Sequence, residues 1–430
     1  MRKNKVEVIT MGCAKNLVDS EVLMQLFASS GYSVEHDPEL FSGEIVVINT
    51  CGFIESAREE SINMILDVIA AKKRGDVGKV YVMGCLSERY REELETELPE
   101  VDGFYGKFNW KELVHDLGKA YHTTPADLRL LTTPPHYAYV KIAEGCNQKC
   151  AYCSIPIMTG GYKSRPMEEI LSEVEALAQA GTVEIQLIAQ DLTYYGVDRY
   201  GTHRLPELVE QICAIEGIEW VRLHYAYPTD FPTDLLRVMR EQPKVCKYLD
   251  IALQHSTDHM LRLMRRRTTA EETEALLARI RREVPGIHIR TTLMVGHPGE
   301  TEADFESLLD FVRRQRFERM GAFIYSHEEG TYGYRHYEDD IPAAIKQERL
   351  DRLMALQEEI ALAEAESKVG TTQRVIIDRL EEDYAIGRTQ YDSPDVDPEV
   401  YVTGEGLRVG HFYQVRITSS VGYDLVGEAL

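Results

Sequence analysis

The sequence predicts an α/β protein of three domains: a small N-terminal parallel α/β sheet domain, a central partial (β/α)6 barrel and a small C-terminal all-β barrel. Three observations favour this architecture. β-rich runs alternate with helical patterns up to residue 326, a Thr- and Pro-rich passage between residues 121 and 135 interrupts the alternation, and short strands replace it after Gly370. The predicted domains span residues 1–125, 135–368 and 369–430.

Composition limits the functions that fit this chain. No run approaches the ~18 apolar residues of a membrane helix and the N-terminus lacks an apolar signal segment, so we expect no membrane span and a cytoplasmic location. The net charge of −23 disfavours a phosphate backbone and favours a basic protein partner. The 8 cysteines are expected as thiolate ligands or buried thiols rather than disulfides. Cys213 and Cys246 have no neighbours at ligand spacing and are predicted core thiols.

The N-terminal domain is predicted to contain three strand-and-helix units. We expect strands at residues 6–10, 45–49 and 79–83, and helices at residues 16–30, 53–74 and 87–97. A cysteine follows each strand within three residues; these are Cys13, Cys51 and Cys85. Strand-to-helix loops of a parallel sheet lie along one edge, so the three thiols should converge there. Buried structural thiols are one interpretation, but the equivalent positions favour a three-thiolate iron–sulfur cluster.

The central domain is predicted to be an incomplete barrel because only six strands alternate with its helices. They are expected near residues 137–142, 183–189, 218–224, 247–253, 287–295 and 320–326. The active sites of such barrels lie at the carboxyl ends of the strands. We therefore expect the chemistry in the loops that follow these strands.

The loop after the first of these strands carries Cys146, Cys150 and Cys153 in a C-x3-C-x2-C pattern. Three thiolates can bind three irons of a 4Fe-4S cluster and leave the fourth iron open. S-adenosylmethionine (SAM) can chelate that iron through its amino and carboxylate groups, and one electron then breaks a C–S bond to give a 5'-deoxyadenosyl radical. A zinc knuckle or a ferredoxin-type cluster would need a fourth Cys or His, and this stretch of sequence has none.

Three residues of the barrel are expected to contact the cofactor. Tyr152 lies within the cysteine motif, Gln190 follows the second strand, and Arg290 within the fifth strand could pair with the cofactor carboxylate or, equally, form a structural ion pair. No side chain is expected to act as a catalytic acid or base. The run Arg265–Arg267 is interpreted as a solvated helix end rather than an RNA-binding patch.

The C-terminal domain is predicted to be a small β-barrel of the oligonucleotide-binding type. After a helical connector at residues 342–368, short strands are expected at residues 373–379, 385–389, 400–403, 412–418 and 423–427. Residues 369–430 contain five Lys and Arg against eleven Asp and Glu, a net charge of −6 that makes a poor RNA clamp. The loop Asp392–Glu399 is acidic, and we expect it to bind a cationic protein segment.

The C-x3-C-x2-C motif resembles that of the radical SAM superfamily, and the whole chain resembles its methylthiotransferase family. The segments Gly12–Glu21 and Arg388–Asp397 are similar to the branch that modifies an aspartate of ribosomal protein uS12. The tRNA-modifying branch usually shows Gln-Met-Asn where this chain has Ala14–Asn16. The chain departs from the uS12 branch at Asp395 and Pro398, where Glu and Gly are usual, and Thr159-Gly-Gly-Tyr162 replaces a more basic loop.

This resemblance implies two 4Fe-4S clusters and SAM as cofactors, and a C-terminal domain of the TRAM type. An auxiliary cluster on Cys13, Cys51 and Cys85 would handle sulfur, and the radical cluster would occupy the other triad. One SAM would methylate the sulfur, and a second would give the radical that removes hydrogen from the aspartate β-carbon. The carbon radical would then capture the methylthio group.

The resemblance also implies the partners. They are uS12 in the small ribosomal subunit, a low-potential reductant such as flavodoxin or ferredoxin, and a sulfur donor. Two other functions remain as alternatives: a tRNA adenosine methylthiotransferase, which the acidic terminal barrel disfavours, and a non-catalytic iron–sulfur electron-transfer or scaffold protein.

Overall fold

The structure, a computed structural model, describes residues 2–107, 109–117 and 129–430. The chain divides into two compact units. The first contains residues 1–133, 139–148 and 153–176, and the second contains residues 134–138, 149–152 and 177–430. The first part of the predicted Thr- and Pro-rich linker, with the predicted boundary at residue 125, lies outside the described residues.

The first unit is built on a five-stranded parallel sheet in the order β2-β1-β3-β4-β5. Its strands are β1 (Arg2–Thr10), β2 (Ser33–His36), β3 (Gly43–Thr50), β4 (Lys79–Gly84) and β5 (Gly103–Phe104). Its helices are α1 (Ala14–Ser29), α2 (Glu55–Arg74), α3 (Cys85–Glu97) and α4 (Trp110–Asp116). The predicted parallel sheet with crossover helices is confirmed, with β2 and β5 as additional strands.

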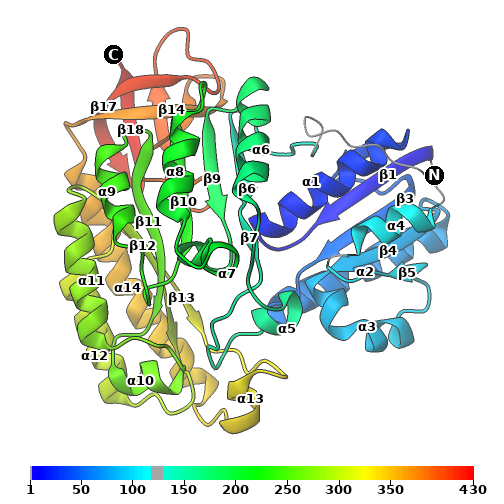
Figure 1. The fold of residues 1–430 in the computed structure, drawn as a ribbon, viewed down its shortest axis with the longest axis horizontal. Coiled ribbons are helices and arrows are strands. Elements are labelled where there is room, and N and C mark those ends of the chain that lie inside the picture. The colour runs from blue at the N-terminus through cyan, green and yellow to red at the C-terminus, as the bar shows by residue number, and fades with distance from the viewer. Residues whose placement is uncertain (1, 108, 118–128) are drawn as a thin grey trace. The chain divides into compact units, whose positions relative to one another are not determined.

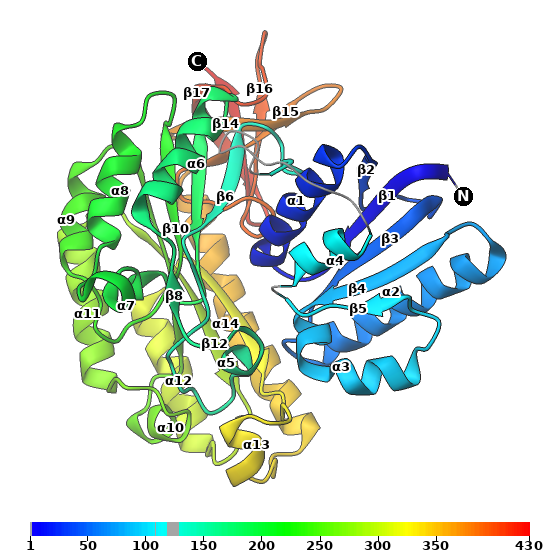
Figure 2. The ribbon, with the colours of Figure 1, turned by 45° about the vertical axis from the view of Figure 1, so that its right-hand side comes forward.

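Both faces of this sheet are covered, which explains the uninterrupted apolar run of residues 45–48 in β3. Along β3, Ile45 and Val47 pack with residues of α1 and α4. Val46 and Ile48, which point to the other face, pack with residues of α2 and α3. Figure 2 shows β1, β3 and β4 running side by side among these helices.

The first unit also contains the loop region that carries two cysteines of the second triad. Its elements are the hairpin of β7 (Ala143–Glu144) and β8 (Lys163–Ser164), the short helix α5 (Ile155–Thr159) and most of α6 (Met167–Gln179). Gly145 has a φ of +73°, and a Cβ there would lie 2.2 Å from the carbonyl oxygen of Gly161. Only glycine lets the two backbone segments approach so closely at this point.

The chain forms an open six-stranded sheet in the order β13-β12-β11-β10-β9-β6, and the second unit contains all of it except the last three residues of β6. The strands are β6 (Tyr137–Lys141), β9 (Glu184–Ile188), β10 (Trp220–Ala226), β11 (Val245–Gln254), β12 (His288–Val295) and β13 (Arg319–Ile324). Strands β9 to β13 pair in parallel and in sequence order. This is the predicted partial (β/α)6 barrel, with β6 and β13 at its two edges.

Helices line the outer side of this sheet, as Figure 1 shows for α8, α9, α11 and α12. The connections contain the 3-10 turn η1 (Leu192–Tyr194), α7 (Val197–Tyr200), α8 (Leu205–Ala214), α9 (Asp234–Glu241), α10 (Asp258–Leu263), α11 (Ala270–Glu283), α12 (Glu302–Gln315) and α13 (Tyr332–His336). The long helix α14 (Ala343–Ser367) packs along β13 and against α12. It is the helical connector expected at residues 342–368.

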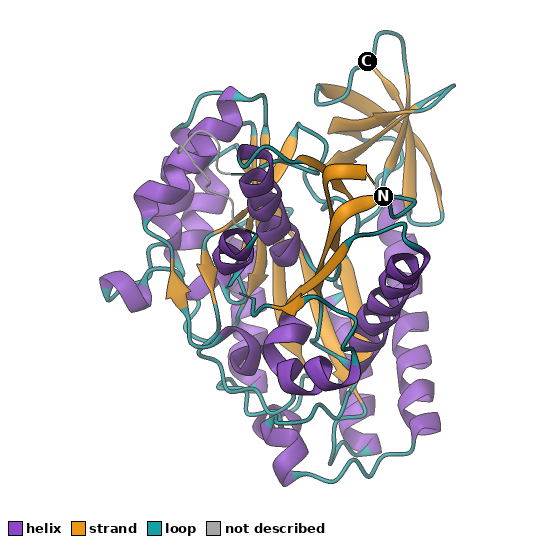
Figure 3. Cartoon of the chain, turned by 90° about the vertical axis from the view of Figure 1, so that its right-hand side faces the viewer, coloured by secondary structure: helices purple, strands orange, loops and turns teal. Residues whose placement is uncertain are grey.

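The C-terminal domain is a closed barrel in the order β14-β15-β16-β18-β17. Its strands are β14 (Thr372–Leu380), β15 (Ala385–Thr389), β16 (Val400–Thr403), β17 (Phe412–Val421) and β18 (Asp424–Ala429). Figure 3 shows this domain as strands and loops near the C-terminus. The predicted five strands and their closure are confirmed.

Buried ion pairs join the terminal barrel to the central barrel within the second unit. Glu184, the first residue of β9, binds Arg222 of β10 at 3.0 Å and Arg388 of β15 at 2.8 Å. Arg388 also binds Asp378 of β14 at 2.7 Å. The side chains of Glu184, Arg222 and Arg388 are at most 3% exposed. These contacts explain why the two predicted domains form one compact unit.

In the part of the chain that the structure describes, no helix has the length and apolar character needed to cross a membrane.

Candidate iron–sulfur and cofactor sites

The structure places the N-terminal cysteines at the carboxyl ends of three neighbouring strands. Cys13 follows β1 and begins α1, Cys51 directly follows β3, and Cys85 follows β4 as the first residue of α3. Because β1, β3 and β4 are parallel neighbours, all three thiols lie along one edge of the sheet. This arrangement is the one that the sequence predicted.

Close packing at this edge depends on Gly12. Its φ is +91°, and a Cβ there would lie 2.8 Å from Cβ and 2.9 Å from Sγ of Cys51. Any larger residue would therefore displace Cys51, and the left-handed backbone would add strain. Glycine at this position keeps the β1 loop against the thiol of Cys51.

The three thiols differ in their electrostatic surroundings. Burial alone would raise the pKa of Cys13, but its pKa is lowered overall. The lowering comes from the charge of Lys15, the backbone N–H groups of Asn16 and Lys15, and the charge of Lys107. Burial raises the pKa of Cys85 to about 12 against the charge of Lys107. Iron binds thiolates, so loading of this triad requires release of the Cys85 proton.

A buried network of two lysines and two carboxylates lies in the same unit. Lys107 Nζ is 3.4 Å from Glu144, and Lys141 forms close ion pairs with both Glu144 and Asp19. Burial disfavours the charge of Lys107, but Glu144, Asp19 and the thiols of Cys85 and Cys13 raise its pKa. Sequence patterns did not identify these residues, and Asp19 was noted only as part of the segment Gly12–Glu21.

The second triad is divided between the units: Cys146 and Cys153 belong to the first and Cys150 to the second. In the first unit, the backbone N–H of Gln148 donates to Cys146 Sγ at 3.4 Å, and Cys153 is half-buried. In the second unit, Cys150 is buried, and its Sγ is 3.6 Å from the Tyr227 hydroxyl and 3.9 Å from Arg266 Nη1.

Buried polar atoms gather at the carboxyl ends of the barrel strands. Gln190 Oε1 follows β9, Gln254 Oε1 ends β11, and Ser256 Oγ lies two residues further on. Among the described residues none of these three atoms has a hydrogen-bond partner. Buried acceptors of this kind fit a ligand that brings N–H or O–H donors, as the amino and ribose groups of SAM do.

Gln254 also has strained backbone. Its φ is +71°, a left-handed conformation that is costly for a residue with a side chain and is common at binding sites. The sequence singled out Gln190 as a cofactor contact, a role that stays a prediction, but it did not single out Gln254 and Ser256, which lie within three residues of the end of the strand expected at residues 247–253.

No group of three or more His, Cys, Asp or Glu side chains in the described residues converges on a point where one metal ion would bind. In a 4Fe-4S cluster each thiolate binds a different iron, so its sulfurs need not converge on a point. Three thiols along one sheet edge fit such a cluster in the first unit.

Arg290 is the third residue of β12 and therefore lies toward the amino end of that strand. Its Nη1 is 3.4 Å from Asp397 and 3.5 Å from the Tyr248 hydroxyl. These contacts support the structural ion pair that the sequence left open rather than a contact with the cofactor carboxylate.

The acidic loop Asp392–Glu399 does not form the free acidic surface that the sequence suggested. Asp392 binds Arg319 at 2.5 Å, Asp397 accepts from the Tyr248 hydroxyl at 2.9 Å, and Glu399 binds Arg379 through two hydrogen bonds. Three of its four carboxylates therefore have cationic or hydroxyl partners within the second unit. These internal partners reduce the charge that the loop can offer to a basic protein, and docking of such a protein there stays a prediction.

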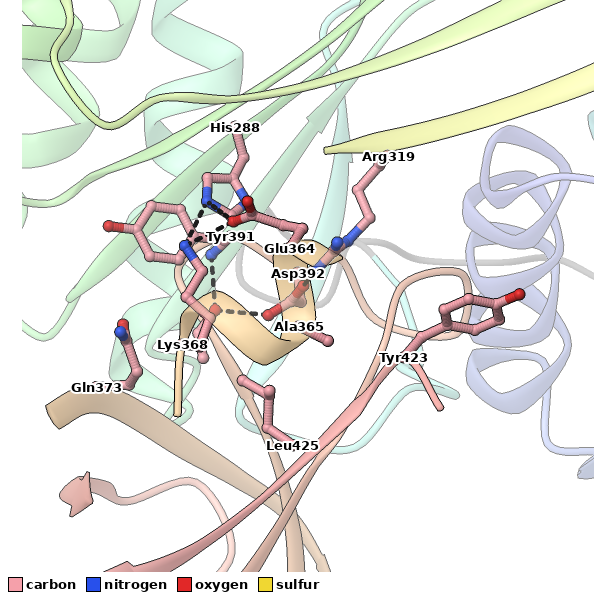
Figure 4. Close-up of a pocket in the computed structure, with 11 residues that line it drawn as sticks. His288, Arg319, Glu364, Ala365, Lys368, Gln373, Tyr391, Asp392, Tyr423 and Leu425 are labelled. Carbon is pink, nitrogen blue, oxygen red and sulfur yellow. Dashed lines mark hydrogen bonds and ion pairs between the residues drawn. The ribbon is translucent and has the colours of Figure 1, made fainter. Parts of the chain in front are cut away.

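Figure 4 shows the pocket in which Asp392 lies, at the amino ends of β12 and β13. Its polar groups bind one another: Lys368 Nζ is 2.9 Å from His288 Nε2 and 2.8 Å from Glu364. Tyr391 stacks on His288 with ring centroids 4.0 Å apart. The pocket thus belongs to the contact between the two barrels, at the end of the strands away from Gln190 and Gln254.

The arginine run also differs from its interpretation as a solvated helix end. Arg265 and Arg267 are exposed, but Arg266 is only 6% exposed and points toward Cys150. Cys213 and Cys246, in contrast, are the buried core thiols that the sequence predicted.

Three family models match the chain. The radical SAM superfamily matches residues 140–312, a family described as "Uncharacterized protein family UPF0004" matches residues 5–106, and the TRAM domain matches residues 369–430. The three matches follow the three predicted domains in order.

Curated relatives match over the full length. The chain is 64% identical to the ribosomal protein uS12 methylthiotransferase RimO of Parabacteroides distasonis, with 100% of both chains covered. It is 61% identical to the protein of the same name from Porphyromonas gingivalis, with 99% of both covered. The corresponding protein of Christiangramia forsetii is 50% identical, with 100% of this chain and 95% of the relative covered.

Two solved structures share the fold. The radical S-adenosylmethionine methyltransferase TsrM from Kitasatospora setae gives a TM-score of 0.54 at 16% identity over 75% of each chain. The cobalamin-dependent S-adenosylmethionine radical enzyme OxsB gives a TM-score of 0.52 at 12% identity over 83% of this chain and 56% of the other. At these identities the likeness concerns the fold alone.

Proposed function

The chain belongs to the family of ribosomal protein uS12 methylthiotransferases, and on that premise we propose that it adds a methylthio group to the β-carbon of an aspartate of uS12. The observation that carries this proposal is the 64% identity over the full length of a curated member of that family. Two cysteine triads, one in each of the domains that handle cofactors, support it chemically.

In this proposal Cys13, Cys51 and Cys85 hold an auxiliary 4Fe-4S cluster that handles sulfur. Their common position at one sheet edge supports this role. The positive charges of Lys15 and Lys107 favour thiolates over thiols there, and they also favour an anionic sulfur species near the triad.

Cys146, Cys150 and Cys153 hold the second 4Fe-4S cluster. When bound, this cluster and SAM supply the radical that breaks the unactivated C–H bond. Gln190 and Tyr152 are the proposed SAM contacts of the barrel, and the unsatisfied Oε1 of Gln190 supports a hydrogen bond from an N–H of the SAM amino group. The side chains hold and orient the reactants, and none acts as a base, because the aspartate β-C–H is too weakly acidic for proton transfer to a side chain.

The partners follow from this chemistry. The radical step needs a low-potential one-electron reductant such as flavodoxin or ferredoxin, and the product needs a sulfur donor. The substrate is uS12 in the small ribosomal subunit, which gives the enzyme a cytoplasmic location. A tRNA adenosine substrate is disfavoured by the net charge of −6 in the terminal barrel.

Mass spectrometry tests the proposal directly. Reconstituted protein, SAM, a low-potential reductant and a sulfur donor are incubated with small ribosomal subunits and tRNA, and uS12 peptides and tRNA nucleosides are then analysed. One methylthio group on an aspartate of uS12, with tRNA unchanged, is the expected result. A methylthio group on a tRNA adenosine with unmodified uS12 would replace the proposal by its tRNA alternative.

A further inference from the structure

Arg266 is a buried cation placed by the end of a helix. Arg265, two residues after the end of helix α10, has a left-handed backbone with a φ of +55°. The backbone N–H of Arg266 donates to the Leu261 carbonyl at 2.8 Å. The N–H of Arg265 bonds the Arg262 carbonyl at 3.0 Å, which completes a Schellman motif. This reversal of the chain turns Arg266 inward while Arg265 and Arg267 stay exposed.

The guanidinium of Arg266 contacts the cysteine loop and the barrel wall. Nη1 lies 3.9 Å from Cys150 Sγ and donates to the Tyr152 hydroxyl at 3.2 Å. Nη2 donates to the Ala252 carbonyl, and the guanidinium carbon lies 4.2 Å from the centroid of the Tyr227 ring.

The backbone fixes the same geometry. The N–H of Ala151 bonds the carbonyl of Met264, and the carbonyl of Ala151 accepts from Gly333. The cysteine loop is thus clamped between the turn after α10 and the start of α13, and the distance between Arg266 and Cys150 is held by main-chain bonds as well as side chains.

Arg266 has no carboxylate partner among the described residues, and its Nε has no hydrogen-bond partner there. Burying a cation without an anion costs several kcal/mol, so such a group is retained where an anion binds. The nearest candidate anion is the thiolate of Cys150 and whatever iron–sulfur group that thiolate holds.

We propose that Arg266 is a positioning residue that sets the reduction potential of the iron–sulfur group at Cys146, Cys150 and Cys153, with the Tyr227 hydroxyl as a second donor to the Cys150 sulfur. The inference rests on the proposed function, because it requires Cys150 to be an iron ligand. Hydrogen bonds to the sulfurs and local net charge are two of the factors that set such potentials.

The direction of the effect follows from charge. One electron from a low-potential one-electron reductant adds one unit of negative charge at the cluster, while the reductant is oxidised by one electron. Arg266 stabilises the more negative state and so makes reduction easier. In the radical reaction this help is needed before SAM cleavage, because the electron must arrive at the cluster first.

The test is a redox titration monitored by electron paramagnetic resonance in full-length protein. The background carries Cys13→Ala, Cys51→Ala and Cys85→Ala, so that the signal comes from the second triad alone. We expect Arg266→Gln to lower the equilibrium constant for one-electron reduction about tenfold, equivalent to about 59 mV. Arg266→Lys, which keeps the charge, should lower it less, and Tyr227→Phe should lower it about threefold.

Arg265→Gln is the matched control. It removes the same charge one residue away, where the guanidinium lies 4.0 Å from the Tyr332 ring at the surface, and it should leave the potential unchanged. Unchanged potentials in Arg266→Gln and Tyr227→Phe would overturn the inference.

If Arg266→Gln holds no cluster, the reduction potentials of Arg266→Lys and Tyr227→Phe test the inference instead. Unchanged potentials in both variants would overturn it. A background protein without iron would instead overturn the proposed function, and this inference with it. Iron in the background with unshifted potentials would overturn this inference alone.

Discussion

Cys13, Cys51 and Cys85 come from three strand ends far apart in the sequence, whereas Cys146, Cys150 and Cys153 lie in one short loop. The first triad is therefore assembled by the packing of a whole sheet. The second is assembled by local chain geometry, with support from Arg266, Tyr227 and the turn after α10. We therefore expect substitutions outside the cysteines to remove the two clusters by different routes, although both triads have the same ligand chemistry.

Removing each triad should give the largest contrast. With Cys146, Cys150 and Cys153 replaced by Ala, both SAM cleavage and methylthio transfer should be lost, and about four of eight irons should remain, because each triad holds one four-iron cluster. With the N-terminal triad replaced by Ala, 5'-deoxyadenosine should still form under reduction, but uS12 should receive no methylthio group. Iron analysis and product chromatography measure both. Full methylthiolation by the second variant would abolish the division of labour.

Gly12→Ala should break only the triad that depends on the sheet. The new Cβ would lie within 3 Å of Cys51, so the thiol must move and the N-terminal cluster should be lost while the other is retained. Gly31→Ala is the control, because Gly31 has a similar φ of +86° but open space around its Cβ position. Iron content near eight in Gly31→Ala and near four in Gly12→Ala is the expected outcome; equal iron in both would show that the close packing is unimportant.

Much of this contrast was predictable from the sequence, because alternating strand and helix patterns place Cys13, Cys51 and Cys85 at equivalent points and a spacing motif defines the other triad. Strand β2 was missed because it is a short edge strand whose residues are exposed or half-buried, so it lacks the apolar run of a central strand. Arg266 was missed because its burial depends on the turn at Arg265, and a run of three arginines looks the same whether or not one points inward.

The partners of the acidic loop were equally hidden. Asp392 pairs with Arg319, which lies 73 residues earlier in the chain, and no local pattern connects the two. The net charge of a segment does not distinguish carboxylates that have cationic partners from carboxylates that are exposed to solvent. Only the fold shows that Asp392 and Asp397 are paired with residues of the central barrel.

A substitution in the buried ion pairs should lower the thermal stability of the second unit more than that of the first. Arg388→Gln leaves the buried carboxylates of Glu184 and Asp378 with less compensation, and loss of one partner of a buried ion pair costs about 3–5 kcal/mol. The second unit should therefore unfold at a lower temperature, with loss of the cluster at Cys150 before the N-terminal one. Arg416→Gln, which removes an exposed ion pair with Glu428, is the control and should change little. Simultaneous loss of both clusters in Arg388→Gln would contradict this separation.

Lowering the pH should have the smallest of these effects on stability, and this effect also arises in the second unit. Burial lowers the pKa of His297 to about 4, below its usual value of ~6.5, so the unfolded chain binds a proton more readily than the folded one. The stability from neutral His297 is fully present above pH ~6.5 and is lost toward pH 4, at about 1.4 kcal/mol per pH unit. Thermal melts at pH 6.5 and 5.5 should show a weaker pH dependence in His297→Gln than in the parent or in the exposed-site control His411→Gln. Parallel pH dependences in all three would exclude His297 as the cause.

The ion pairs of Glu184 and Arg319 with the terminal barrel also bear on how such enzymes change by recombination. A β-barrel attached through a flexible linker can be exchanged between proteins as an independent cassette. Here the incoming barrel would have to supply an arginine for Glu184 and a carboxylate for Arg319, or leave these buried charges with fewer partners. Exchange of the terminal domain alone is therefore expected to be selected against, so that the two barrels are inherited together and substitutions at their shared charges occur in compensating pairs.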